Sequence, residues 1–156
     1  MIEIFIPGYK KLILRHLVMD YNGTMACDGK LIDGLKDLLG KLSDKLDVYV
    51  LTADTFGCVK AELSGMDVKI AILPEKEQDK GKLDYIQKLG PESTVCIGNG
   101  RNDRLMLKSA ELGIAVVQEE GACVETLTSA DVVCENVLSA LNLLVHTKRL
   151  IATLRS

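Results

Sequence analysis

Short apolar runs alternate with amphipathic segments along most of this chain, and this alternation constrains the fold more than any other feature of the sequence. The runs are rich in Val, Ile and Leu, which is typical of strands buried on both faces of a sheet. The expected strands are Asp47–Thr52, Val68–Leu73, Ser93–Gly98, Ile114–Val117 and Asp131–Cys134.

Segments with helical periodicity lie between these runs. In Asp33–Leu46 the apolar positions recur with the spacing of one helix face, namely Leu35, Leu38, Leu39, Leu42 and Leu46. Further helices are expected over Thr55–Leu63, Asp79–Leu89, Asp103–Leu112 and Asn136 to about Leu154. Strands that alternate with helices predict parallel strands joined by right-handed crossovers. We therefore expect an α/β fold, a Rossmann-like three-layer αβα sandwich with a mainly parallel central sheet.

Two regions outside this alternation predict small β elements. The first residues resemble a strand and a turn at Pro7-Gly8, followed by a second apolar run, Lys11–Met19, which ends at Asp20. The segment Met25–Ile32 resembles a flap hairpin. A chain of this length fits one domain, which we expect to span residues 1–156.

Composition excludes several classes of protein. With 47% hydrophobic and 26% charged residues the chain is ordinary for a globular protein, and its net charge of −3 does not favour nucleic acid as a partner. No apolar run approaches the ~20 residues of a membrane-spanning helix, and the N-terminus lacks the pattern of a secretory signal. The five cysteines show no C-x-x-C spacing, so we expect reduced thiols and a cytoplasmic protein without a membrane partner.

Polar clusters follow three of the expected strands. Asp20 ends the run that precedes Asn22-Gly23-Thr24, Thr52 ends another strand, and a glycine-rich loop leads from Gly98 to Asp103. In a parallel sheet these strand ends meet at one edge, where ligands bind. A strand-end carboxylate such as Asp20 can act as a nucleophile, and two carboxylates with carbonyl and water oxygens suit Mg²⁺. The pattern predicts a site for magnesium and a phosphate group.

In this order the motifs resemble those of the haloacid dehalogenase-like superfamily, which run Asp-x-Asp-Gly-Thr, a strand-end Ser or Thr, a Lys and an acidic loop. The segment Gly98-Asn99-Gly100-Arg101-Asn102-Asp103 is similar to the Gly-Asp-Gly-x-Asn-Asp hinge motif of P-type ATPases. The chain therefore most resembles the soluble relatives of the P-type ATPase phosphorylation domain. The resemblance covers almost the whole chain and implies a Mg²⁺-dependent phosphatase or phosphotransferase.

The resemblance also implies a role for each matching residue. Asp20 becomes phosphorylated as the nucleophile, Thr52 hydrogen-bonds the phosphoryl oxygens, and Thr24 supports the loop. The implied magnesium ligands are Asp20, the backbone carbonyl of Asn22, Asp103 and Asn99. The implied substrate-binding residues are Gly23, Thr24, Thr52, Ala53, Arg101 and Asn102.

Two lysines compete for the family's motif lysine, which neutralises charge on the nucleophile and the phosphoryl group. Lys82 fits the P-type pattern because Tyr85-Ile86 and Leu89 follow it at helical spacing, whereas Lys80-Gly81 fits the Lys-Gly form of other branches. We favour Lys82 and keep Lys80 as the alternative.

The chain departs from the family pattern at two positions. Asn22 stands where most family phosphatases have an Asp that protonates the leaving group, and a carboxamide has no such proton. General acid–base catalysis contributes about 10²- to 10⁴-fold, so we expect slow hydrolysis. Asn99 stands where the pumps have Asp, which predicts weaker Mg²⁺ binding. The alternative is a degenerate relative that binds Mg²⁺ and a phosphorylated ligand or protein partner in a regulatory role.

The spacing of the motifs leaves no room for a cap domain. The intervals from Thr24 to Thr52 and from Thr52 to Lys82 each hold little more than one helix, with the flap in the first interval. Capless members of the superfamily act on macromolecules or close their site with a neighbouring subunit. We therefore expect a homo-oligomer whose substrate is a phosphorylated small molecule or a phosphoprotein.

Overall fold

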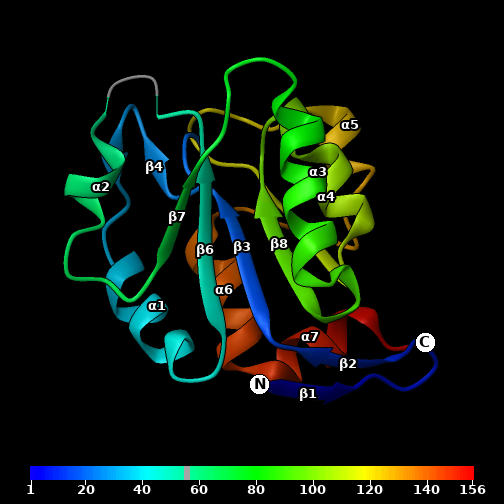
Figure 1. Ribbon diagram of the computed structural model, residues 1–156. Helices are drawn as coiled ribbons and strands as arrows, with labels where there is room; N and C mark the ends of the chain where they lie inside the picture. Colours follow the sequence, from blue (N-terminus) through cyan, green and yellow to red (C-terminus); the bar gives the residue numbers. More distant parts are fainter. Residues whose placement is uncertain (55–56) are drawn as a thin grey trace.

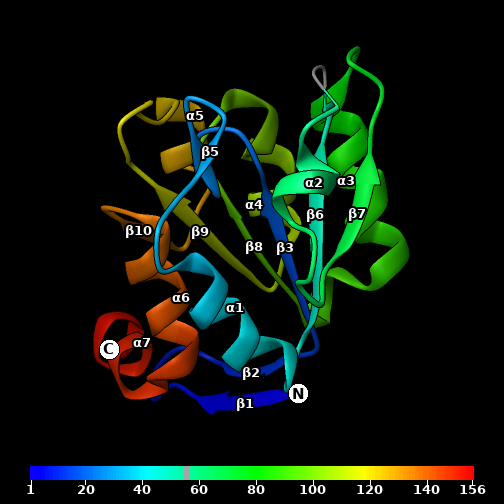
Figure 2. The same cartoon turned by 90° about the vertical axis from the view of Figure 1, so that its left-hand side faces the viewer.

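The central element is a parallel sheet, seen in a computed structural model that describes residues 1–54 and 57–156. Within these residues six parallel strands are arranged in the order β10-β9-β8-β3-β6-β7 (Figures 1 and 2). Their bounds are β3 (His16–Asp20), β6 (Asp47–Thr52), β7 (Lys69–Ile72), β8 (Thr94–Gly98), β9 (Leu112–Val116) and β10 (Val132–Cys134). The expected Rossmann-like α/β class is confirmed.

Strand β3 lies in the middle of this sheet because its residues are apolar on both faces. It pairs in parallel with β6 on one side and β8 on the other, with His16 opposite Asp47 and Thr94. Asp20 stands opposite Leu51 in this register, so β3, β6 and β8 all end at the same edge. Figure 1 shows that the flap and α5 (Val124–Leu127) lie at that edge too.

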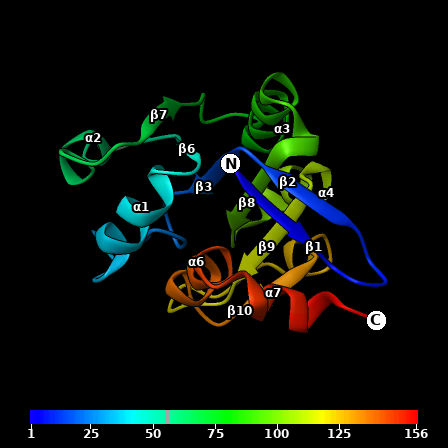
Figure 3. The same ribbon diagram turned by 90° about the horizontal axis from the view of Figure 1, so that it is seen from below.

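Helices cover both faces of the sheet, as Figure 3 shows along the strands. On one face lie α1 (Leu35–Ser43) and α6 (Val137–Val145), and on the other α3 (Gln78–Leu89) and α4 (Arg104–Ser109). Alternate residues of β3 point to opposite faces. Leu17 and Met19 join the core under α1 and α6, and Val18 joins the core under α3 and α4.

Two hairpins and several short helical segments complete the described part of the fold (Figures 1 and 2). Strands β1 (Ile2–Phe5) and β2 (Lys11–Leu14) pair below the sheet, where α7 (Thr147–Leu154) packs on β1. The expected flap is confirmed as β4 (Ala26–Cys27) and β5 (Lys30–Leu31). The other short helical segments are α2 (Val59–Glu62) and 3-10 helices at Pro91–Ser93 and Arg101–Asp103. No cap domain occurs among the described residues.

The expectation of one continuous apolar run over Lys11–Met19 is wrong, because the structure divides it at Arg15. Strand β2 alternates exposed and buried residues and belongs to the hairpin with β1. Strand β3 is buried almost throughout and belongs to the central sheet. The two patterns of burial reflect their different surroundings, since a hairpin has one wet face and a central parallel strand has none.

Several expected helices are shorter than their sequence patterns. The C-terminal segment is two helices, α6 and α7, bent by 101° at His146, and this bend brings Leu150 into the core. The Asp103–Leu112 pattern ends as helix at Ser109, because Ala110 is extended and Leu112 already belongs to β9. In Thr55–Leu63 only α2 is helical, and residues 55–56 lie outside the described residues.

Within the described part of the chain, no single helix is long and apolar enough to cross a membrane. The bent pair α6 and α7 passes the same length and composition criteria only when both helices are taken together. Most of α6 is apolar because it packs into the core, with Val137, Ala140, Leu141 and Leu144 buried.

Candidate active site

Three charged side chains meet at the carboxyl edge of the sheet. The Lys82 Nζ donates hydrogen bonds to Asp20 Oδ1 and to Asp103 Oδ1, each at 2.6 Å. All three side chains are buried, with exposed fractions of 9% for Asp20, 1% for Lys82 and 0% for Asp103. A lysine held between two buried carboxylates is a costly arrangement that folding alone does not require.

The loop after β8 holds Asp103 in place through its backbone. Asp103 Oδ2 accepts hydrogen bonds from the N–H groups of Asn99 (3.0 Å) and Gly100 (2.9 Å), which leaves Oδ1 for Lys82. A Cβ on Gly98 would lie 2.5 Å from the Asp103 Cγ, so the carboxylate occupies space that only glycine leaves free. The glycine at the end of β8 therefore allows the acid to reach the site.

The loop that follows Asp20 is a tight turn built on one carbonyl. The oxygen of Tyr21 accepts hydrogen bonds from the N–H groups of Thr24, Met25 and Ala26. Gly23 adopts a φ of 82°, and a Cβ there would lie 2.3 Å from the Asn99 side chain. The glycine of the Asp-x-Asn-Gly-Thr motif is thus required by both backbone conformation and close packing.

The positive charge of the site comes from Lys82 in helix α3, which packs on the face of the sheet opposite α1 and α6. Lys82 lies on the buried side of α3 together with Ile86, whereas Lys80 is exposed and pairs with Glu77. The structure therefore places Lys82 against the two acids and directs Lys80 into a surface ion pair. The spacing of Tyr85, Ile86 and Leu89 after Lys82 favoured the same residue.

The buried charges shift each other's pKa. Burial, and then the negative charge of Asp103, raise the pKa of Asp20 from 3.8 to about 7, while Lys82 and the Thr24 hydroxyl oppose this rise. Burial lowers the pKa of Lys82, but the two carboxylates outweigh that effect and hold its pKa above the ordinary value of 10.5. Lys82 is therefore charged at neutral pH, and the two acids exceed the positive charge beside them.

The Asn99 side chain is occupied by protein contacts. Its Oδ1 accepts a hydrogen bond from Thr24 Oγ1 (3.2 Å), and its Nδ2 donates to the carbonyl of Gly121 (3.0 Å). An Asp at this position could not donate to that carbonyl. Asn99, which stands where the pumps have Asp, thus removes a negative charge and also links the loop after β8 to the segment that contains Gly121.

The remaining expected residues lie around the acids to different degrees. Thr52 is buried at the end of β6, where its Oγ1 accepts a hydrogen bond from the N–H of Asp54, and no acceptor among residues 1–54 and 57–156 takes its own proton. Asn22 is exposed in the loop after Asp20, and Ala53 is half-buried. Asn102 donates to Gln78, and the exposed Arg101 pairs with Glu125, so neither side chain joins the acids.

Gln118 was not among the expected site residues, but its side chain holds the loop after Asp20. Its Nε2 donates to the carbonyls of Gly23 (2.8 Å) and Thr24 (2.9 Å). Gln118 follows β9 at the same edge of the sheet as the other site residues. A single glutamine two residues after the end of β9 matches no motif, so no local sequence signal marks this role.

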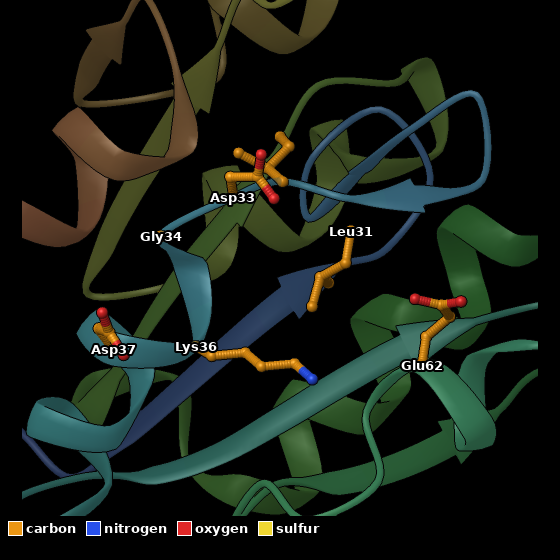
Figure 4. Close-up of a pocket in the computed structure, with 7 residues that line it drawn as sticks. Leu31, Asp33, Gly34, Lys36, Asp37 and Glu62 are labelled. Carbon is orange, nitrogen blue, oxygen red and sulfur yellow. The ribbon is translucent and has the colours of Figure 1, made fainter.

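A cavity of about 300 Å³ lies beside the flap and is separate from the three charged residues (Figure 4). Lys36 extends along it toward Glu62, and Asp33 and Asp37 also line it. Its polar lining is carried by exposed side chains of α1, α2 and the segment between β5 and α1. The buried acids therefore mark a different place from this surface cavity.

The donors around Asp20 and Asp103 fit a magnesium ion. No group of three or more His, Cys, Asp or Glu side chains forms a metal cage among the described residues. Mg²⁺ does not need such a cage, because it is commonly held by one or two carboxylates together with water and phosphate oxygens. Two buried acids facing one cation supply the hard oxygen donors and the unbalanced negative charge that this ion requires.

Sequence comparisons found relatives in Methanocaldococcus jannaschii, while no family model matches the chain. An uncharacterized protein is 45% identical over 74 residues, which cover 47% of this chain and 80% of the relative. A soluble P-type ATPase-like phosphatase is 28% identical over 136 residues, covering 83% of this chain. The match spans about half of that phosphatase (49%).

Solved structures with the same fold include two sugar-phosphate phosphatases. A cobalt-bound deoxy-D-mannose-octulosonate 8-phosphate phosphatase from Haemophilus influenzae has a TM-score of 0.71 at 14% identity, covering 87% of this chain and 90% of that one. The 3-deoxy-D-manno-octulosonate 8-phosphate phosphatase from Moraxella catarrhalis, in complex with magnesium, phosphate and its sugar, has a TM-score of 0.67 at 19% identity. It covers 91% of this chain and 94% of that one.

Proposed function

Because this chain has the haloacid dehalogenase-like fold of these phosphatases, we propose that it is a Mg²⁺-dependent phosphohydrolase or phosphotransferase that works through a phosphorylated Asp20. The resemblance inferred from its motifs is confirmed at the level of the fold. The observation that carries the proposal is the buried arrangement of Asp20, Lys82 and Asp103 at the carboxyl edge of the sheet.

In the first step a carboxylate oxygen of Asp20 attacks the phosphorus atom. The bond between phosphorus and the leaving oxygen breaks, and that oxygen keeps the electron pair and takes a proton from water. Lys82 lies against Asp20 and balances the negative charge gathered there, and the Thr52 hydroxyl donates to a phosphoryl oxygen. Such preorganised donors lower the barrier of phosphoryl transfer.

In the second step water attacks phosphorus, the bond to Asp20 breaks, and inorganic phosphate leaves. Asn22 lies in the loop after Asp20 but has no proton to give or take, so both steps lack the family's general acid–base. We infer slow turnover and a preference for good leaving groups, such as nitrophenolate or the carboxylate of an acyl phosphate.

Asp20, Asp103, the backbone carbonyl of Asn22 and Asn99 would hold the magnesium ion. When bound, the ion supplies positive charge that neutralises the phosphoryl group. The Asn99 side chain also links the loop after β3 to the segment that contains Gly121, through its hydrogen bonds with Thr24 and Gly121.

The test is release of phosphate from p-nitrophenyl phosphate and acetyl phosphate, with and without Mg²⁺. Turnover that requires Mg²⁺ and disappears in Asp20→Asn is the expected result. Asp67→Asn is a matched control, because Asp67 is an exposed acid just before β7, at the opposite edge of the sheet. Equal activity in Asp20→Asn and the wild type would refute the proposed nucleophile.

The alternative function is binding of a phosphorylated ligand or protein without hydrolysis, and Asn22 is the residue that favours it. The variant Asn22→Asp separates the two functions. A rise in phosphate release of about 10²-fold or more would identify a working site that lacks its acid–base. No rise, with Mg²⁺ still bound, would favour the binding role.

A further inference from the structure

Gln118 joins three parts of the molecule through one side-chain amide. Its Nε2 donates to the carbonyls of Gly23 and Thr24, and its Oε1 accepts a hydrogen bond from the N–H of Val137 at 2.8 Å. Val137 is the first residue of α6, so this N–H is free of the helix's own bonds. The three partners come from the loop after β3 and from the beginning of α6.

This network admits only one orientation of the Gln118 amide. A rotated amide would place Oε1 against two carbonyl oxygens and Nε2 against the N–H of Val137, so all three contacts would be lost. Nε2 therefore has to face the loop. A side chain of the same length that cannot donate there would lose the link to the loop but keep the link to the helix.

The loop after Asp20 leaves these two carbonyls free. Its own hydrogen bonds gather on the carbonyl of Tyr21, and the N–H of Gly23 donates to Ala26. The carbonyls of Gly23 and Thr24 point away from that turn toward Gln118. Gln118 thus binds the two carbonyls of the loop that take no part in the loop's internal hydrogen bonds.

The segment that carries Gln118 is itself fixed to the acidic loop after β8. Asn99 Nδ2 donates to the carbonyl of Gly121, and the N–H of Cys123 donates to the carbonyl of Asn99. At its start, the N–H of Val117 donates to Cys134 in β10. The chain is therefore hydrogen-bonded to neighbouring segments on both sides of Gln118.

We propose that Gln118 is a positioning residue that holds the loop of the nucleophile in the geometry needed for phosphoryl transfer. The proposal rests on the proposed function of Asp20. The side chain touches neither the acids nor Lys82 and acts only through the backbone that follows Asp20. A displacement of about 1 Å in a reacting group lowers rates by about 10²-fold, so this anchor has a measurable effect on turnover.

The test compares Gln118→Glu with Gln118→Met and with the control Gln87→Glu. Glu keeps the acceptor for Val137 but cannot donate to the loop, and Met removes both links. Gln87 is an exposed glutamine of α3 whose side chain donates to the Ser109 hydroxyl, far in sequence from the loop. Two quantities are measured: kcat and KM for p-nitrophenyl phosphate, and hydrogen exchange of the amides in residues 21–26.

Both Gln118 variants are expected to lower kcat by about 10²-fold with little change in KM and to speed exchange in residues 21–26. Gln87→Glu should change neither quantity. A loss of thermal stability with unchanged kcat and unchanged exchange in this loop would overturn the proposal. If the wild type releases no phosphate, the proposed function fails. Exchange in residues 21–26 then still decides whether Gln118 holds the loop.

Discussion

Replacing Asp20 by Asn is expected to stabilise the protein in the absence of divalent metal. The variant removes a negative charge that is buried beside a second carboxylate, while Lys82 keeps its bond to Asp103. Asp20 has its pKa raised from 3.8 to about 7 by burial and by Asp103, and this value already includes the attraction to Lys82. At about 1.4 kcal/mol per pH unit, the ionised Asp20 costs the folded state about 4 kcal/mol.

The sign of this effect follows from the direction of the shift. A group with a raised pKa in the folded state contributes full stability below its unfolded pKa and loses that contribution as the pH rises through its folded pKa. The wild type should therefore lose stability relative to Asp20→Asn between pH 4 and pH 7. Above about pH 7 the difference levels off at about 4 kcal/mol in favour of the variant.

The assay is urea unfolding of both proteins in EDTA at pH values from 4.5 to 8. Asp103→Asn is the matched control, because an amide oxygen can keep the two backbone N–H bonds of Oδ2, but the amide NH2 would then replace the oxygen that accepts from Lys82. That variant should lose about 1–3 kcal/mol of stability. Addition of Mg²⁺ should stabilise the wild type and so reduce the difference in the free energy of unfolding between wild type and Asp20→Asn. An Asp20→Asn variant that is less stable than wild type in EDTA at pH 8 would refute the reasoning.

Four further predictions follow from the same contacts. Lys82→Met leaves two buried carboxylates without a cation and should cost about 3–5 kcal/mol at pH 8 in urea unfolding, and an unchanged midpoint would contradict this. Thr52→Val removes a donor to the phosphoryl group and should lower kcat by about 10²- to 10³-fold. It also removes the acceptor of the Asp54 N–H and should cost about 1 kcal/mol of stability. Gly23→Ala meets Asn99 at a φ of 82° and should lose more than about 1 kcal/mol, as thermal unfolding can measure. Sedimentation equilibrium should show a homo-oligomer, and a monomer at all concentrations would argue against closure of the site by a neighbour.

The sequence predicted the central sheet well because its strands are short, apolar and separated by helical periodicity. Asp47–Thr52 has the same limits as β6, and the other expected strands differ from the observed ones by one or two residues at their ends. The acids were also predictable, because a parallel sheet brings Asp20 and Asp103 to one edge. That a lysine joins them was implied by the resemblance to the family, and the spacing after Lys82 favoured this residue over Lys80.

Other features depend on contacts that local patterns do not contain. The bend at His146 follows from packing, since the segment from Val137 to Leu154 has helical periodicity on both sides of it. The division at Arg15 depends on strand pairing, since β2 pairs with β1 whereas β3 pairs with β6 and β8. Gln118 was missed because a single glutamine after a strand carries no motif, and its role becomes visible only when Gly23 and Thr24 lie against it.

The bonds of Lys82 reach Asp20 across 62 positions of the chain and Asp103 across 21. Three segments that are remote in sequence therefore have to dock before the cation stands between the acids. A folding intermediate in which α3 has not yet packed on the sheet would expose both carboxylates without a counter-charge and would hold phosphate poorly. The complete site therefore exists only in molecules in which all three segments have docked.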